Sequence, residues 1–284
     1  MVKKHYKPVL PDMQRPVLEH VLFACCLEDA HYQAAEEAFA AVVHTFFDLN
    51  EIRVTSIAEL CEVMSVLPAP KPAAHRLKRM LQAIFEATYA FDLEECRKKN
   101  LGPTIKWLQE LDGATNFVVS YVVQSALGGH AIPIGVGEVE VLHIVDMVTE
   151  KDVKRRVVPG LERAVAKSKG IEFGSMLHQL GADFVANRFS PAVQKILLQI
   201  DPNCKDRFPK RRSGKKPSKK SAAAKSKTDP DGKKTTSSPE TPAATSKKKS
   251  SASQKQADVK ASSESGSMKD KKSASEGLSK RKPR

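Results

Sequence analysis

The sequence has no apolar run long enough to cross a bilayer, because its longest apolar stretches are interrupted by Ser, Gln and Gly. The amino-terminal residues, MVKKHYKPVLPD, are basic but lack the apolar segment of a secretory signal. These absences predict a cytoplasmic protein that has no membrane partner.

Cysteine is scarce, and its arrangement excludes the usual thiol-based frameworks. The chain has five cysteines, two of them adjacent at Cys25 and Cys26, and an odd number argues against a disulfide scaffold. No two cysteines have the C-x2-C spacing of a metal site, so we expect buried small apolar side chains and no bound metal. This usage fits a reducing compartment.

Strand-like alternation of apolar and polar residues is almost absent, and it occurs only in a short Gly-Glu-Val-Glu-Val run at 137–141. Apolar residues elsewhere recur at helical spacing, as in 77–85 (LKRMLQAIF). The sequence therefore predicts an all-α fold.

Two helix starts can be predicted from local chemistry. Ser56 and Glu59 form a capping-box pattern for a helix that ends near Met64. Asp29 is expected to cap a helix over 32–47, because Asp is a favoured N-cap residue.

Positive charge is concentrated at the carboxyl end. The 284-residue chain carries a formal net charge of +14, but residues 205–284 alone hold 25 Lys and Arg against 8 Asp and Glu, a net charge of +17. Residues 1–204 therefore carry a net charge of −3. The tail, residues 205–284, has few large apolar side chains to offset the entropy cost of folding, so we expect it to be disordered.

Basic clusters in this tail are dispersed among Ser and Ala, as in linker-histone tails, and include Lys210, Arg211, Arg212, Lys215 and Lys216. Such a chain neutralises phosphates without reading base sequence. The same composition also fits a solvated extension that only aids solubility.

The stretch from 104 to 145 is the most informative part of the chain. A helix from Ile105 to Leu111 is followed by the turn Asp112-Gly113-Ala114-Thr115 and a second helix, Asn116–Leu127. Two helices joined in this way can direct backbone N–H groups toward a phosphate oxygen. Gly113 also suits an ordinary helix–helix turn, in which it supplies only a left-handed backbone.

A carboxylate follows this pair of helices. Pro133 is followed five residues later by Glu138, at the start of another apolar helix. A carboxylate at a helix start is stabilised by the helix dipole whatever its function.

In the order and spacing of these segments, residues 14–200 resemble the helix–hairpin–helix/Gly-Pro-Asp superfamily of base-excision DNA glycosylases, of which endonuclease III is a member. The family's hairpin, Leu-Pro-Gly-Val-Gly, falls on 111–115, and its Pro-to-Asp segment falls on Pro133 and Glu138. The resemblance implies a helical body over 1–204 with two lobes, lobe A over about 30–128 and lobe B over about 1–29 plus 129–204.

The resemblance also implies a partner and a site. It implies a monomer that binds double-stranded DNA in base-excision repair and associates with the nucleoid. It assigns DNA contacts to the hairpin residues Gly113, Ala114, Thr115 and Asn116. His130, in a Gly-Gly-His loop, suits either a DNA contact or a solvated loop residue. Glu138 would be the catalytic acid that stabilises the sugar cation and positions water.

Several departures from the family pattern limit the chemistry. Thr115 replaces the second hairpin glycine, and Phe117 replaces the lysine that forms a Schiff base, which excludes lyase chemistry at that position. Only Cys204 lies beyond Gly181, so the iron–sulfur loop is absent and no cofactor is expected. Any catalysis would be monofunctional hydrolysis on a flipped base.

Two alternatives remain open. One is a non-catalytic DNA-binding or architectural protein on the same fold. The other is an unrelated all-α interaction protein whose tail binds nucleic acid or another acidic partner.

Overall fold

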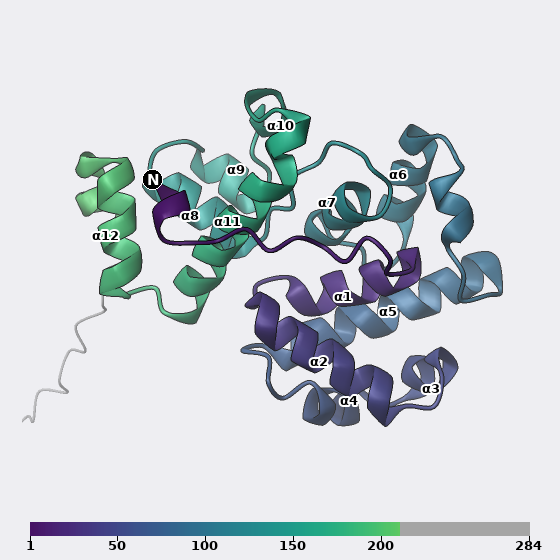
Figure 1. Cartoon of the computed structure of the whole chain (residues 1–284). Coiled ribbons are helices and arrows are strands. Elements are labelled where there is room, and N and C mark those ends of the chain that lie inside the picture. Colours follow the sequence, from purple (N-terminus) through teal and green to yellow (C-terminus); the bar gives the residue numbers. More distant parts are fainter. Residues whose placement is uncertain (211–284) are drawn as a thin grey trace, which may run out of the picture. The chain divides into compact units, whose positions relative to one another are not determined.

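The computed structural model describes residues 1–210 of the chain. These residues are all-helical and contain no strand, which confirms the predicted all-α fold (Figure 1). In chain order the α-helices are α1 (Val17–Leu27), α2 (Tyr32–Thr45), α3 (Leu49–Val54), α4 (Ile57–Val63), α5 (Pro70–Thr88), α6 (Leu101–Glu110), α7 (Asn116–Ser125), α8 (Val136–Ile144), α9 (Glu150–Arg155), α10 (Leu161–Ala164), α11 (Lys167–Ala186) and α12 (Pro191–Ile200). The 3-10 helices are η1 (Val2–Lys4), η2 (Glu94–Arg97) and η3 (Pro202–Arg207).

Helices α1 to α7 enclose the larger apolar core, and α1 lies at its centre. Ten of the eleven residues of α1 are buried, because its sequence VLEHVLFACCL is apolar on nearly every face. It contacts α2, α5 and α7 (Figure 1). The expected division placed residues 1–29 in lobe B, whereas α1 packs with the helices of lobe A.

Helices α8 to α12 pack around two smaller apolar clusters. The backbones of α8 and α11 touch at Gly137 and Gly181, where a Cβ added to Gly137 would lie 2.2 Å from the Gly181 carbonyl oxygen. The strand-like run at 137–141 lies inside α8. Helix α8 is buried on more than one face. The alternation of Glu and Val therefore does not indicate a strand with one buried side.

Both ends of the described chain pack onto this second group of helices. The amino-terminal segment runs along α11, where the Tyr6 hydroxyl donates to Asp183 Oδ2 at 2.5 Å and the Val9 amide donates to Ser175 Oγ at 2.8 Å (Figure 1). At the other end, Arg207 Nε donates to the Ile144 carbonyl at 2.6 Å. The boundary expected after residue 204 therefore falls inside η3, and the packed body extends at least to Phe208.

Of the two predicted helix starts, one is confirmed and one is wrong. The Ser56 hydroxyl accepts the Glu59 amide at 3.2 Å and begins α4. Asp29 does not cap α2, whose N-cap residue is His31. Asp29 instead has a left-handed backbone, with φ of 66°, and its carboxylate accepts the Val136 amide at 3.0 Å, so it caps α8 from a distant part of the chain.

Candidate nucleic-acid interface

The predicted pair of helices around Gly113 is present as α6 and α7. Gly113 has a φ of 89°, and a Cβ added there would lie 2.7 Å from the Cβ of Arg79 and 3.0 Å from the Arg76 carbonyl oxygen. The Ala114 amide closes the turn by donating to the Leu111 carbonyl at 3.0 Å. Gly113 is thus required by the close approach of α5, whether or not the turn binds a phosphate.

Thr115 is the N-cap residue of α7. Its hydroxyl accepts the Val118 amide at 3.1 Å and donates to Glu28 Oε2 at 2.8 Å. Thr115, which stands where the resembled family has its second hairpin glycine, therefore holds the hairpin in place. The amides of Asn116 and Phe117 are in the first turn of α7, where no carbonyl within the helix can accept them.

Glu28 is a buried carboxylate beside this turn, and no local sequence pattern marks it as part of a site. Its carboxylate lies 3.3 Å from Arg76 Nε and 3.6 Å from Arg156 Nη1, while its side chain is only 1% exposed. Burial raises the pKa of Glu28, and the charge of Arg76 and the hydrogen bond from Thr115 oppose that increase. Two arginines are thus held close to the start of α7 by one buried acid.

A cavity of about 240 Å³ opens beside the start of α7, and we call it the hairpin cavity. Gln109, Asn116 and Ser120 give it a polar wall, since Asn116 and Ser120 are one helical turn apart on the same face of α7. The rest of the lining is mostly apolar and comes from the segments before α8 and around α10: Ile132, Ile134, Arg156, Val157, Val158, Leu161 and Glu162. The hairpin cavity is smaller than the roughly 300–1,000 Å³ of drug-sized sites.

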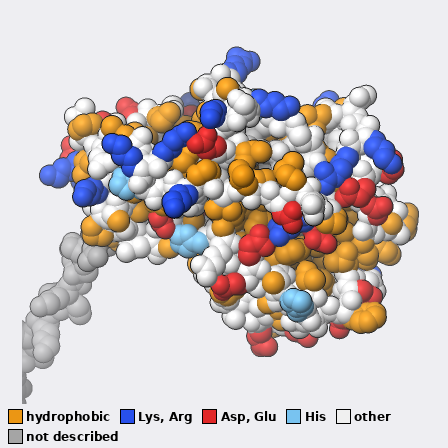
Figure 2. Space-filling view, in the orientation of Figure 1, with side chains coloured by type: hydrophobic (Ala, Val, Ile, Leu, Met, Phe, Trp, Pro, Cys, Tyr) orange, Lys and Arg blue, Asp and Glu red, His pale blue; other side chains and the backbone are white. Residues whose placement is uncertain are grey.

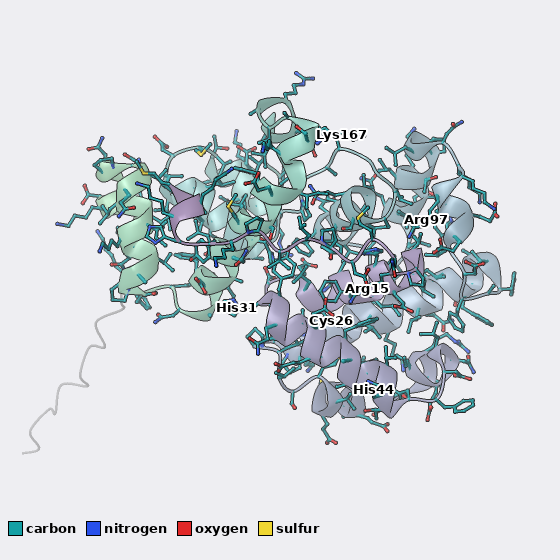
Figure 3. All side chains as sticks on the ribbon, in the orientation of Figure 1. Arg15, Cys26, His31, His44, Arg97 and Lys167 are labelled. Atoms are coloured by element: carbon teal, nitrogen blue, oxygen red, sulfur yellow. The ribbon has the colours of Figure 1, made fainter. Side chains whose placement is uncertain are left out.

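The part of the cavity lining from Arg156 to Glu162 belongs to a basic segment of the chain. Residues 151–169 contain seven Lys and Arg against two acidic residues, Asp152 and Glu162. Lys and Arg side chains gather over α10 and the start of α11 at the upper edge of the view, where Lys167 lies (Figure 2, Figure 3). This segment is hidden in the overall composition, because the net charge of residues 1–204 is slightly negative. A count in short windows would have found it.

Glu138 is buried in the interior, with its side chain 1% exposed. Its Oε2 accepts the Gly135 amide at 3.0 Å in a capping arrangement, and its Oε1 lies 2.6 Å from His178 Nδ1. Glu138 does not line the hairpin cavity. The ring of Phe117, on α7, lies 5.3 Å from the His178 ring, so one side chain separates Glu138 from the second hairpin helix.

The hydrogen-bond partners of His178 indicate where the hydrogens of its ring lie. Its Nε2 lies 2.8 Å from the Ala30 carbonyl, which can only accept, so Nε2 carries a hydrogen. One further proton then lies between Nδ1 and the carboxylate. Burial lowers the pKa of His178, but the hydrogen bond and charge of Glu138 outweigh it and raise that pKa above 6.5, which favours an imidazolium–carboxylate pair.

The remaining predicted site residues lie apart from one another. His130 Nε2 lies 2.7 Å from the Glu162 carbonyl and 2.9 Å from the Val165 carbonyl, so its ring fastens the loop before α8 to the α10 segment. Phe117 is buried in the core. Lys210 is exposed at the end of the described chain. Four predicted contacts lie outside the described residues, as does most of the tail expected to be disordered: Arg211, Arg212, Lys215 and Lys216.

Residues 1–210 contain no group of three or more His, Cys, Asp or Glu side chains placed to hold a metal ion. In the same part of the chain, no helix combines the length and apolarity needed to cross a membrane. Comparison of the sequence with models of known protein families and with curated proteins gives no match.

Proposed function

We propose that this protein binds duplex DNA in the manner of the helix–hairpin–helix base-excision glycosylases that its sequence resembles. The observation that supports this most strongly is that the hairpin cavity, the uncommitted amides of α7 and Arg156 lie together at the start of one helix. The basic segment 151–169 includes Arg156 and supplies part of the cavity lining.

The phosphate contacts in this proposal come from the backbone and from arginine. The first amides of α7 point outward from a helix N-terminus, which favours an anion. Arg156 is 52% exposed, and its link to Glu28 is a 3.6 Å contact that leaves guanidinium donors for a phosphate. Glu28 would hold Arg156 near the hairpin before DNA arrives.

The base would enter the hairpin cavity after it is extruded from the duplex. Its volume of about 240 Å³ suits one planar ring system. Gln109, Asn116 and Ser120 offer hydrogen bonds to a base edge, and Ile132 and Ile134 offer an apolar face. The proposed reaction is hydrolysis of the N-glycosidic bond without strand cleavage, because Phe117 supplies no amine.

Glu138 would stabilise the sugar cation in that reaction, and for this it would have to leave His178. Its burial and its two hydrogen bonds favour the second candidate, a DNA-binding protein of the same architecture that does not catalyse base release. Removing an acid from such a buried pair costs about 3–5 kcal/mol, which a bound duplex would have to supply.

The binding experiment compares Arg156→Ala with Arg188→Ala in the full chain, using fluorescent duplexes at near-physiological salt. Arg188 is a matched control, since it is 48% exposed and also pairs with a glutamate, Glu140. It follows the carboxyl end of α11, whereas the basic segment includes the amino end of that helix. A helix of 20 residues spans about 30 Å, so Arg188 lies far from the basic segment. We expect Arg156→Ala to weaken binding about tenfold and Arg188→Ala to leave it unchanged. Equal effects of the two variants would refute the proposed interface, and binding lost only on removal of the tail would support the unrelated interaction protein.

The catalytic experiment uses duplexes that carry oxidised, deaminated or mismatched bases. Glycosylase activity predicts base release that leaves an intact abasic strand, no adduct trapped by borohydride, and loss of release in Glu138→Gln. Duplex affinity should stay within about twofold of wild type in this variant, because Glu138 is buried away from the surface. Tight binding without release from any duplex would establish the non-catalytic candidate. A trapped adduct would show that a lysine reaches the sugar, which contradicts the role given to Phe117.

A further inference from the structure

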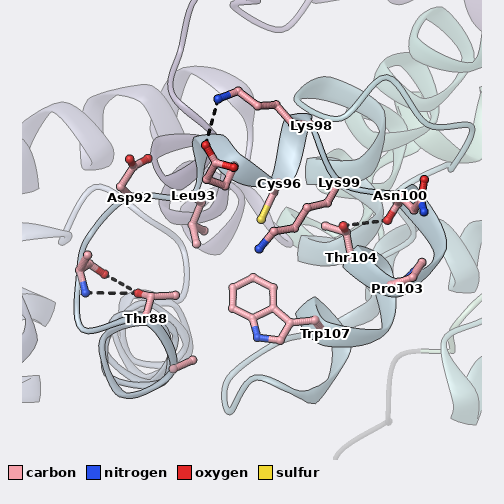
Figure 4. Close-up of a pocket in the computed structure, with 13 residues that line it drawn as sticks. Thr88, Asp92, Leu93, Cys96, Lys98, Lys99, Asn100, Pro103, Thr104 and Trp107 are labelled. Atoms are coloured by element: carbon pink, nitrogen blue, oxygen red, sulfur yellow. Dashed lines mark hydrogen bonds and ion pairs between the residues drawn. The ribbon is translucent and has the colours of Figure 1, made fainter. Parts of the chain in front are cut away.

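A second and larger cavity lies on the opposite side of α6 from the hairpin cavity, and we call it the Trp107 cavity. It has a volume of about 820 Å³ and lies between the end of α5, the segment around η2, and α6 (Figure 4). Trp107 lines it, whereas Gln109 lines the hairpin cavity. Residues two apart on a helix point in nearly opposite directions, so the two cavities are separate.

Trp107 is the only tryptophan of the chain and is partly exposed within this cavity. Lys99 points toward the indole of Trp107 across the cavity (Figure 4). Cys96, Asn100 and Thr104 also line it. An indole face open to a cavity of this size offers a stacking surface for a planar aromatic ring.

Two lysines and two acids line the Trp107 cavity, and one of the lysines has no ion-pair partner among the described residues. Lys98 pairs with Glu95 at 2.9 Å, and Asp92 accepts the Glu94 amide at 2.8 Å. Lys99 forms no ion pair within residues 1–210. The start of α6 lies beside it, where the N-cap residue Asn100 makes no side-chain capping bond. An anion near Lys99 would therefore also meet a helix start without a cap.

We propose that the Trp107 cavity binds a nucleotide unit, with the base stacked on Trp107 and the phosphate held by Lys99. Base stacking on an aromatic side chain together with a nearby cation is the usual chemistry of contacts to single nucleotides. The unit would be either a free mononucleotide or one nucleotide of a single strand. The Trp107 cavity shares no lining residue with the hairpin cavity. Nucleotide binding there therefore does not depend on the duplex-DNA function proposed above for this chain.

The test uses the fluorescence of Trp107 in the full chain, excited at the red edge of indole absorption and titrated with dAMP. Because Trp107 is the only tryptophan, quenching reports occupancy of this cavity directly. We expect saturable quenching by dAMP and affinity at least about fivefold weaker for deoxyadenosine, which lacks the phosphate. Lys99→Ala should bind dAMP with a similarly reduced affinity. Lys106→Ala is the matched control, since Lys106 is exposed on α6 but does not line the cavity.

A short single-stranded oligodeoxyadenylate distinguishes the two sources. A single-strand site predicts quenching at concentrations roughly tenfold lower than for dAMP, with the Lys99→Ala loss retained. A mononucleotide site predicts no such gain. Absence of quenching by dAMP up to about 1 mM, or equal affinities for wild type and Lys99→Ala, would overturn the proposal. Circular dichroism of each variant confirms that the helical fold is intact.

Discussion

His178 Nδ1 lies 2.6 Å from Glu138 Oε1, and both side chains are almost completely buried. The other ring nitrogen of His178 bonds to the Ala30 carbonyl, in the segment that links α1 to α2. The two preceding residues are also bound to distant elements, since Glu28 bonds to Thr115 and Asp29 bonds to Val136. Residues 28–30 thus join the hairpin, α8 and α11 through three consecutive positions.

The Glu138–His178 pair makes stability depend on pH. The pKa of His178 in the folded protein is raised above its ordinary value of 6.5. The contribution of protonated His178 to the free energy of unfolding is therefore fully present below pH 6.5 and is lost as pH rises through the folded-state pKa. We expect the difference in unfolding free energy between wild type and His178→Gln, measured in urea, to shrink between about pH 6 and about pH 9.

His44→Gln is the control for this measurement, because His44 is exposed on α2 (Figure 3). Its difference from wild type should be the same at both pH values. A His178→Gln difference that stays constant or grows with pH would show that the pair does not hold the proton as inferred.

The crossing of α8 and α11 should not tolerate a side chain at Gly137. Alanine there would place its Cβ 2.2 Å from the Gly181 carbonyl oxygen, so the two helices would have to separate. We expect Gly137→Ala to lower the unfolding free energy by about 3 kcal/mol or more, measured by urea denaturation. Gly102→Ala is the control, since no atom lies within 4 Å of the added Cβ and alanine favours α6. Equal stability of both variants would contradict this close crossing.

Purified protein should contain no stoichiometric iron and show no visible absorbance from an iron–sulfur cluster. Such a cluster requires four thiolates, and Cys204 is the only cysteine beyond Gly181. Cys204 is fully buried in the apolar cluster of α8, α11 and α12, where packing would do the bracing that a cluster does in the resembled family. Iron analysis of protein purified without oxygen is the measurement, and one cluster's worth of iron per chain would refute the expectation.

Removal of residues 211–284 should weaken non-specific DNA binding and its salt dependence. This segment carries 22 Lys and Arg against 7 Asp and Glu, so its loss changes the net charge from +14 to −1. The cut after Lys210 preserves η3 and Phe208, which pack on the body. We expect a smaller slope of log K against log salt, because fewer phosphates are neutralised. An unchanged slope would assign the tail a different partner.

The helical character of the chain and the starts of α4 and α7 were predictable from the sequence. Helical spacing predicted the all-α fold, and Ser56 predicted the start of α4. The helices around Gly113 were expected at Ile105–Leu111 and Asn116–Leu127 and are found at Leu101–Glu110 and Asn116–Ser125. These features depend on side chains within one or two turns of each other, so a local pattern suffices to predict them.

The surroundings of the candidate site were decided by tertiary structure alone. The sequence places Glu138 at a helix start, where it caps α8. Only the packing of α11 brings His178, 40 residues away, against it. Thr115 is fixed by Glu28, 87 residues away, and Asp29 caps α8 from 107 residues away. A buried carboxylate needs a partner, but its sequence neighbours do not specify which one. That choice is made when distant helices pack around the same core.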